Sequence, residues 1–426
     1  MEHGYKKLFY GWIIVGAGFL VMAVSMGIVT NCASLFTKPL CDDLGLSRQG
    51  AGWIITITYA GQMVTSLLSG KIFSTFDVRF VMKICAVGVS LGWFLYSLAS
   101  QLWQFYLISV LVGLSVGLVH MVPISILIGN WFHEKQGLAL GAAFMGSGVG
   151  GMLFNSLTGI FLESWGWRTA YQILAAIMFC VLMPVIFLVL RTRPEDMGLE
   201  PLGQRAKERA AGASTSSEEG TSLGTIAHKP SFWMFCVIAL FTVICMNGLM
   251  LNIVPHLSEC GYSASFAANI SALCMGSLAV GKFLLGGLYD RLGIKRATVW
   301  PYLCTLIGLL GLIFAKVPAA LVFLVCCCGV GGAYGSVAFP ILVRSLYGSR
   351  DYSSIYGVVA AVSQLGNMAT PVLLGAVFDV SGSYNPGYWI MAVLTVLMGT
   401  LCLWNFQKIE REACSSVQRT ECGASL

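Results

Sequence analysis

One lysine of this sequence stands inside an apolar stretch, where a positive charge could bind an anion. Lys282 follows the run SALCMGSLAV and precedes FLLGGLY, and the chain becomes polar only at Asp290 and Arg291. Eight residues of helix span about 12 Å, so Lys282 would lie near the middle of a bilayer core of roughly 30 Å if Asp290 marks its edge. A charge at that depth costs at least about 2.5–3.5 kcal/mol and therefore needs an explanation.

Two interpretations of Lys282 compete. In the first, the lysine is structural and either reaches the membrane interface or pairs with an acid on another helix. No Asp or Glu lies in the middle of a predicted span, because Glu163, Glu259 and Asp379 are all near span ends. In the second interpretation, which we favour, an anionic substrate in a water-filled cavity supplies the opposite charge. Lys71 is the contrasting case, since it lies close to a span end.

Other polar side chains at mid-depth could orient such a substrate. They are Asn31, Tyr59, Gln62, His120, Asn247, Asn252, Tyr334 and Gln364. Each of them could instead form a hydrogen bond between helices. His120 is distinctive because imidazole titrates in the physiological range and could carry a coupling proton. The alternative for His120 is a neutral ring that is hydrogen-bonded across helices.

The composition shows which elements must position these residues. Of the 426 residues, 57% are hydrophobic and only 10% are charged, whereas a soluble domain carries about 25% charged residues. Lipid must therefore be the main solvent, and apolar runs of this length fit transmembrane helices better than barrel strands. The 15 cysteines lie mostly in apolar runs without metal-ligand spacing, so we expect no metal and no cofactor.

We predict an all-α polytopic membrane protein with twelve transmembrane helices in two pseudo-symmetric six-helix bundles. The predicted spans are 11–36, 50–74, 80–99, 103–129, 136–161, 168–190, 232–257, 264–288, 295–315, 318–346, 353–378 and 385–406. The first run is expected to be a retained helix and not a signal peptide. The predicted domains are an N-terminal bundle (1–190), a flexible polar cytoplasmic linker (191–231), a C-terminal bundle (232–406) and a cytoplasmic tail (407–426).

The positive charges indicate the orientation of these spans. Most of the 25 lysines and arginines fall on the side that holds both termini and the linker. The other side holds Lys38, Arg48, Arg168 and Lys316, and Lys282 belongs to neither side. By the positive-inside rule the termini are cytoplasmic. The net charge of +6 then follows from topology, so we expect no nucleic-acid partner.

The sequence shows no sign of enzymatic chemistry. The glycine-rich run at 141–159 lacks the lysine of a phosphate-binding loop and lies inside an apolar span. Close packing of helices through small residues explains this composition. We also find no arrangement of a nucleophile with a base, and therefore do not expect an enzyme.

An internal repeat relates the two halves. The stretch GKIFSTFDVR from Gly70 and the stretch GGLYDRLGIK from Gly286 each follow the second helix of a six-helix half. In this alignment Arg79 matches Lys295, and Lys282 matches a serine. Six helices, a linker and six more helices with corresponding loops are typical of a duplicated transporter.

These loops resemble the loop signature of the major facilitator superfamily. The second copy carries the pattern at Gly286, Asp290, Arg291 and Gly293, whereas the first copy, with Gly70 and Arg79, has Ser74, Thr75 and Asp77 in place of Asp, Arg and Gly. Other segments resemble the bacterial branch of monocarboxylate transporters and oxalate:formate antiporters. They are YGWIIVGAGF, SLFTKPLCDDLGLSR, NWFHEKQGLALG and GWRTAY.

The resemblance implies two six-helix bundles that rock around a central site. Asp290 and Arg291 would then belong to a gate that locks the cytoplasmic side, and such relatives place an arginine at the position of Lys282 to hold a substrate carboxylate. Proton-symporting relatives also have an aspartate four residues earlier, where this sequence has Leu278. This difference leaves proton symport, anion exchange and uniport all open.

We therefore predict a secondary active transporter of small organic anions, above all monocarboxylates, that works by rocker-switch alternating access. Its expected partners are a small carboxylate, with or without protons, and the lipid bilayer of the cell membrane, and we expect it to act as a monomer. One alternative is an exporter of neutral or drug-like compounds. A single buried cation argues against cationic substrates but does not argue against neutral ones. A second alternative is a transporter-like sensor, although the tail at 407–426 is short for signalling.

Overall fold

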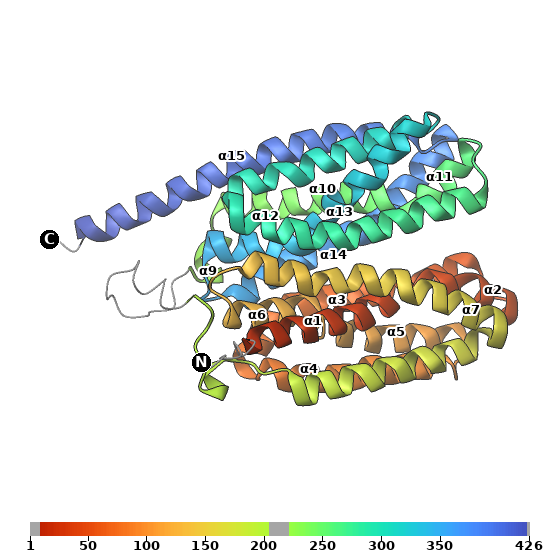
Figure 1. Ribbon diagram of the computed structural model, residues 1–426, viewed down its shortest axis with the longest axis horizontal. Helices are drawn as coiled ribbons and strands as arrows, with labels where there is room; N and C mark the ends of the chain where they lie inside the picture. Colours follow the sequence, from red (N-terminus) through yellow and green to blue (C-terminus); the bar gives the residue numbers. More distant parts are fainter. Residues whose placement is uncertain (1–8, 204–220, 424–426) are drawn as a thin grey trace, which may run out of the picture. The chain divides into compact units, whose positions relative to one another are not determined.

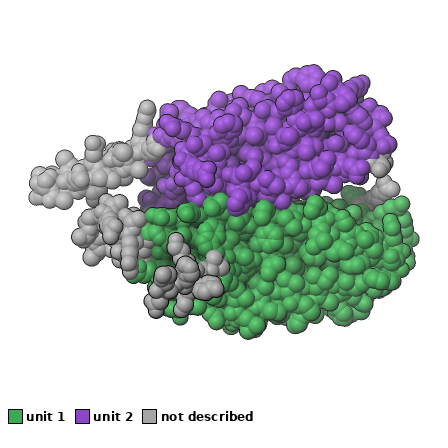
Figure 2. Space-filling model, in the orientation of Figure 1, with its two compact units in different colours: residues 1–215 green, residues 216–426 purple. Residues whose placement is uncertain are grey.

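The computed structural model describes residues 9–203 and 221–423. Helices dominate these residues, and the isolated β-bridge between Phe132 and Leu202 joins two connecting segments. The chain divides into two compact units, residues 1–215 (unit 1) and 216–426 (unit 2), coloured separately in Figure 2. Within each unit the long helices run lengthwise beside one another (Figure 1).

The helices of unit 1 are α1 (Tyr10–Met26), η1 (Gly27–Asn31), η2 (Ala33–Phe36), α2 (Thr37–Leu44), α3 (Arg48–Thr75), α4 (Val78–Tyr96), α5 (Leu102–Val116), α6 (Met121–Trp131), α7 (Gln136–Pro184), η3 (Val185–Val189) and η4 (Glu195–Met197). Those of unit 2 are α9 (Leu223–Ala227), α10 (Pro230–Leu251), α11 (Ile253–Glu259), α12 (Ala264–Ile313), α13 (Pro318–Tyr347), α14 (Tyr352–Ser381) and α15 (Asn385–Gly423).

The predicted number of spans is confirmed within the described residues. Nine segments are long and apolar enough to cross a membrane, and α3 adds a further helix of 28 residues. Two of the nine segments hold two helices each, because α7 breaks at Gly166 (φ 76°) and α12 at Gly293 (φ 72°). Only glycine adopts this left-handed region readily. Both breaks fall within the predicted connections at 162–167 and 289–294, and one glycine makes each turn.

Two predicted spans are interrupted in the structure. The span predicted at 103–129 forms α5 and α6, which are separated at 117–120, and the span predicted at 232–257 forms α10 and α11, which meet at Asn252. A proline follows each break, Pro123 in α6 and Pro255 in α11. Proline has no N–H, so the carbonyl four residues before it lacks its helical donor. Hydropathy did not reveal these breaks because proline lies inside an apolar run.

The predicted repeat is visible where helices cross at glycine. In unit 1 a Cβ atom built on Gly61 of α3 would lie 2.9 Å from the backbone of Gly113 on α5. In unit 2 a Cβ atom on Gly281 of α12 would overlap the backbone of Gly329 on α13. Gly113 and Gly329 have the same sequence separation as Gly70 and Gly286. Corresponding helix pairs therefore pack backbone to backbone in both units.

The predicted linker and tail are only partly described. Of the linker at 191–231, residues 204–220 lie outside the described residues. On its two flanks, the N–H of Leu202 donates to the carbonyl of Trp131 (3.0 Å) and the N–H of Leu223 donates to Asp351 Oδ2 (3.0 Å). Each flank is thus attached to its own unit. The tail predicted from 407 continues α15 as far as Gly423.

Gly281→Ala is expected to lower the free energy of unfolding by about 1–3 kcal/mol, because the added methyl group must separate two helix backbones. Gly276→Ala on the same helix is the matched control, since a Cβ atom there meets nothing within 4 Å. Thermal unfolding in detergent would measure both variants. An equal effect of the two substitutions would contradict the crossing as the cause.

Candidate functional site

Lys282 faces the interior of the protein and not the lipid. Its side chain is 3% exposed, whereas the next two residues of α12, Phe283 and Leu284, are 40% and 55% exposed. The preceding residue, Gly281, is the one that touches α13 at Gly329. The crossing therefore fixes Lys282 along α12 and turns its ammonium group away from the apolar surface.

His120 lies at the break between α5 and α6 and is 3% exposed. Its Nδ1 atom accepts the N–H of Met121 at 2.6 Å, so a neutral ring carries its proton on Nε2. Gly117 lets the break approach α3 closely, because a Cβ atom there would lie 3.2 Å from the Cα atom of Gln62. The imidazole ring of His120 therefore lies where the helical hydrogen bonds between α5 and α6 are interrupted.

Asn31 and Tyr334 make contacts inside their own units. Asn31 Nδ2 donates to the carbonyl of Ser147 at 3.2 Å, which joins η1 to α7. Tyr334 is fully buried on α13, and its hydroxyl hydrogen-bonds with Cys402 Sγ at 3.6 Å. The alternative interpretation for such residues, a hydrogen bond between helices, matches both placements.

The remaining candidates of unit 2 lie on α10 and α14. Gln364 is 7% exposed on α14, and its Oε1 atom accepts from Asn367 Nδ2 at 2.8 Å. Asn247 is half-buried on α10. Asn252 occupies the break after α10, where its carbonyl accepts the hydroxyl of Tyr388 at 3.5 Å. Asn252 therefore forms the break between α10 and α11, and Asn247 lies in the last two turns of α10 before it.

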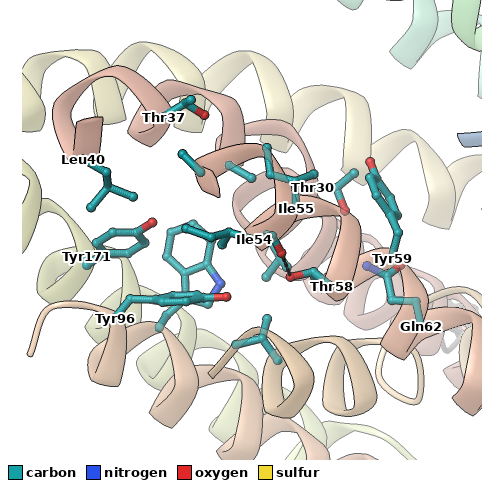
Figure 3. A pocket seen from close by; sticks show the side chains of 15 residues that line it. Thr30, Thr37, Leu40, Ile54, Ile55, Thr58, Tyr59, Gln62, Tyr96 and Tyr171 are labelled. Atoms are coloured by element: carbon teal, nitrogen blue, oxygen red, sulfur yellow. Dashed lines mark hydrogen bonds between the residues drawn. The ribbon is translucent and has the colours of Figure 1, made fainter. Parts of the chain in front are cut away.

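Tyr59 and Gln62 are brought together in a pocket of unit 1 (Figure 3). The pocket contains about 540 Å³ of empty space, part of which is open to solvent. Three further lining residues, Trp93, Tyr96 and Tyr171, were not predicted as site residues. Aromatic residues near span ends are common at membrane interfaces, so the sequence offered no reason to assign Trp93 and Tyr96 to a site. Tyr171 belongs to the segment GWRTAY, whose resemblance to transporter sequences does not by itself indicate a pocket.

The two copies of the loop signature differ in structure. Gly293 makes the left-handed turn of the second copy, and Asp290 and Arg291 before it are exposed, whereas Gly286 is buried. In the first copy Asp77 replaces that glycine, has extended backbone angles and caps α4 by accepting the N–H of Phe80 at 3.1 Å. The first copy therefore starts its helix with a side-chain cap.

Arg79 completes this arrangement in unit 1. Its Nε atom donates to the carbonyl of Ile186 at 3.2 Å, and Nη2 donates to the carbonyl of Phe187. Both carbonyls lie in η3 at the end of the sixth predicted span, where helix carbonyls lack partners. Asp77 Oδ2 accepts the hydroxyl of Thr192 at 2.8 Å nearby. These bonds fasten the start of α4 to the segment around η3. Gly70, which opens this copy, lies on α3 and is buried.

Comparison with known proteins identifies the family. The family model described as Major Facilitator Superfamily matches residues 15–341 and 261–419. The chain belongs to the major facilitator superfamily. It is therefore a multi-pass membrane protein for secondary transport of small solutes and not an enzyme. The predicted superfamily is confirmed.

Two relatives within the superfamily align with most of this chain, and one of them has a narrower name. Monocarboxylate transporter 12 of Mus musculus is 25% identical over 423 residues, which cover 92% of this chain and 85% of the relative. The uncharacterized MFS-type transporter YhjX of Escherichia coli is also 25% identical, over 80% of this chain and 82% of its own. The predicted resemblance to monocarboxylate transporters is confirmed.

Solved structures agree on the fold. The proton:xylose symporter XylE superposes with a TM-score of 0.72 at 17% identity, over 93% of this chain and 96% of its own. The transporter FucP in its outward conformation superposes with a TM-score of 0.68 at 17% identity, over 92% and 97% of the two chains. At these identities the likeness concerns the fold alone.

Arg79→Ala is expected to lower the free energy of unfolding by about 1–3 kcal/mol, because it leaves two carbonyls of η3 without their donor. Arg79→Lys should recover part of the loss, since an ammonium group can reach one carbonyl but lacks the fork of a guanidinium. Thermal unfolding in detergent would rank the three proteins. Equal melting temperatures for wild type and Arg79→Ala would show that the arginine does not stabilise this end of unit 1.

Proposed function

We propose that the protein transports small organic anions, above all monocarboxylates, and that Lys282 binds the carboxylate group. The observation that carries this proposal is a lysine with 3% exposure beside lipid-facing residues of a membrane helix. A charged side chain inside a membrane costs free energy, and such residues typically mark the path of a substrate or an ion. The names of relatives that align with 92% of the chain support the same substrate class.

Lysine imposes particular demands on the rest of the site. An ammonium group is a compact point charge and does not fix the plane of a carboxylate as a guanidinium does. Other polar groups must therefore orient the substrate. The candidates remain Asn31, Tyr59, Gln62, His120, Asn247, Asn252, Tyr334 and Gln364. His120 has the better case, because it occupies a helix break.

The proposed mechanism is rocker-switch alternating access. Binding of the anion would neutralise Lys282, which lowers the cost of moving the loaded site through an apolar environment. Gly286, Asp290, Arg291 and Gly293 would form the gating loop, with Gly70 and Arg79 as its counterpart. We further propose a monomer in the cell membrane, with both termini and the linker at 191–231 on the cytoplasmic side.

Coupling to protons is assigned to His120 in this proposal. The sequence has Leu278 where proton-symporting relatives are expected to carry an acid next to the helix cation. A proton must then travel on an imidazole, on the lysine or with the substrate. The ring of His120 lies at a mid-span break and would take up the proton on Nδ1, so the hydrogen bond from the N–H of Met121 must open when the ring becomes charged. Without such a carrier, anion exchange and uniport are the alternatives to proton symport.

Lys282→Ala is expected to reduce the uptake of labelled lactate, pyruvate, formate or oxalate into proteoliposomes at least about 100-fold, because the countercharge for the carboxylate is removed. Lys282→Arg should retain uptake with altered selectivity among the acids. Lys71→Ala is the matched control, since this lysine is exposed near a helix end. The proposal fails if the wild type takes up none of these acids, or if Lys282→Ala is fully active.

His120→Asn is expected to abolish uptake driven by a pH gradient while acid-for-acid exchange continues. Asparagine is a good N-cap, so its side-chain oxygen can accept the N–H of Val122 in the first turn of α6 and preserve the fold, but it cannot carry a proton. Counterflow and gradient-driven uptake would be compared in the same proteoliposomes. His256→Gln serves as the control for a second buried histidine. Unchanged gradient-driven uptake in His120→Asn would remove His120 from the coupling path.

A further inference from the structure

The pocket of unit 1 contains a buried donor that has no partner among the residues that the structure describes. Trp93 is 2% exposed and lines the pocket, and its Nε1 atom has no hydrogen bond. An indole N–H can only donate. The indole N–H can therefore donate to an acceptor from outside the chain, either a ligand or a water molecule.

The walls around Trp93 are aromatic and close-packed. The ring of Tyr171 lies 5.1 Å from that of Trp93 and 5.2 Å from that of Tyr96, and it stacks on Phe36 at 3.9 Å. In Figure 3, Tyr96 and Tyr171 stand at one end of the pocket and Tyr59 at the other. Such walls suit a short apolar body with one polar end.

The polar atoms of the pocket are neutral. Thr58 Oγ1 donates to the carbonyl of Ile54 at 2.9 Å, marked by the dashed line in Figure 3, and the Tyr96 hydroxyl hydrogen-bonds with Ser109 Oγ at 2.7 Å. The lining residues include no Lys, Arg, Asp or Glu. An ion here would lose its hydration without gaining an opposite charge. The lining therefore favours an uncharged ligand.

The corresponding region of unit 2 is filled. The alignment that matches Gly70 with Gly286 places Trp93 against Leu309 and Tyr96 against Leu312. Both leucines are fully buried members of the hydrophobic core of unit 2. The pocket is therefore a feature of unit 1 and does not arise from the packing that the two repeats share.

We propose that this pocket binds a small uncharged molecule that has a hydrogen-bond acceptor on a short apolar body, the chemistry of a short carboxamide. Trp93 donates to the acceptor, and Tyr96 and Tyr171 enclose the apolar body. The inference rests on contacts within unit 1 alone and does not depend on the anion-transport proposal.

Isobutyramide and isobutyrate form a matched pair of probes, since they share a shape and differ in charge. Binding would be measured by saturation-transfer difference NMR on the full-length protein in detergent. Isobutyramide should bind wild type and Lys282→Ala with equal affinity. Trp93→Phe should weaken that binding about tenfold, the effect of one hydrogen bond of about 1.4 kcal/mol. Isobutyrate should not compete in Lys282→Ala.

Ala51→Leu gives an independent test. Ala51 lines the pocket at 3% exposure, so leucine fills the space while every hydrogen-bonding group remains, and binding of the amide should again fall about tenfold. Trp103→Phe, at a tryptophan that is 57% exposed, is the control and should bind as wild type does. The proposal is overturned if wild type does not bind the amide, as for a pocket that holds only water, or if Trp93→Phe and Ala51→Leu both bind it unchanged.

Discussion

The contact on which both units depend is the crossing of two helices at glycine backbones. In lipid, apolar surface gains little by leaving one apolar environment for another, so close packing must hold helices together. Gly61 against Gly113 in unit 1 and Gly281 against Gly329 in unit 2 provide that closeness. The crossing in unit 2 immediately precedes Lys282. The same small residue that lets the helices meet therefore fixes where the buried charge lies.

Interrupted helices form the second theme of the structure. His120 and Asn252 each stand at a break inside a predicted span, and a proline follows each within a few residues. Backbone groups released in this way are tolerated at membrane depth only where protein or water satisfies them. A break thus creates a polar locus in an apolar helix without any charged side chain, which explains why titratable or amide groups are found there.

The sequence was sufficient for what depends on hydropathy and spacing. Span number, the repeat and the exceptional position of Lys282 all follow from apolar runs of known length. The breaks inside predicted spans were missed, at residues 117–120 and at Asn252, because a proline within an apolar run does not alter mean hydropathy. The pocket was missed for another reason: Phe36, Trp93 and Tyr171 meet only after folding, and each alone resembles an ordinary core aromatic residue.

Comparison of matched positions shows how the duplicated halves have diverged in chemistry. The partner of Lys282 is Ser66, which is 3% exposed in unit 1, so the half with the neutral pocket has a hydroxyl where the other has a charge. Conversely, the partner of Trp93 is Leu309 in the filled core of unit 2. The glycines at the two crossings, Gly113 and Gly329, are themselves matched positions of the repeat. The crossing of the helices is therefore kept in both halves, while the side chains around it differ in charge and size.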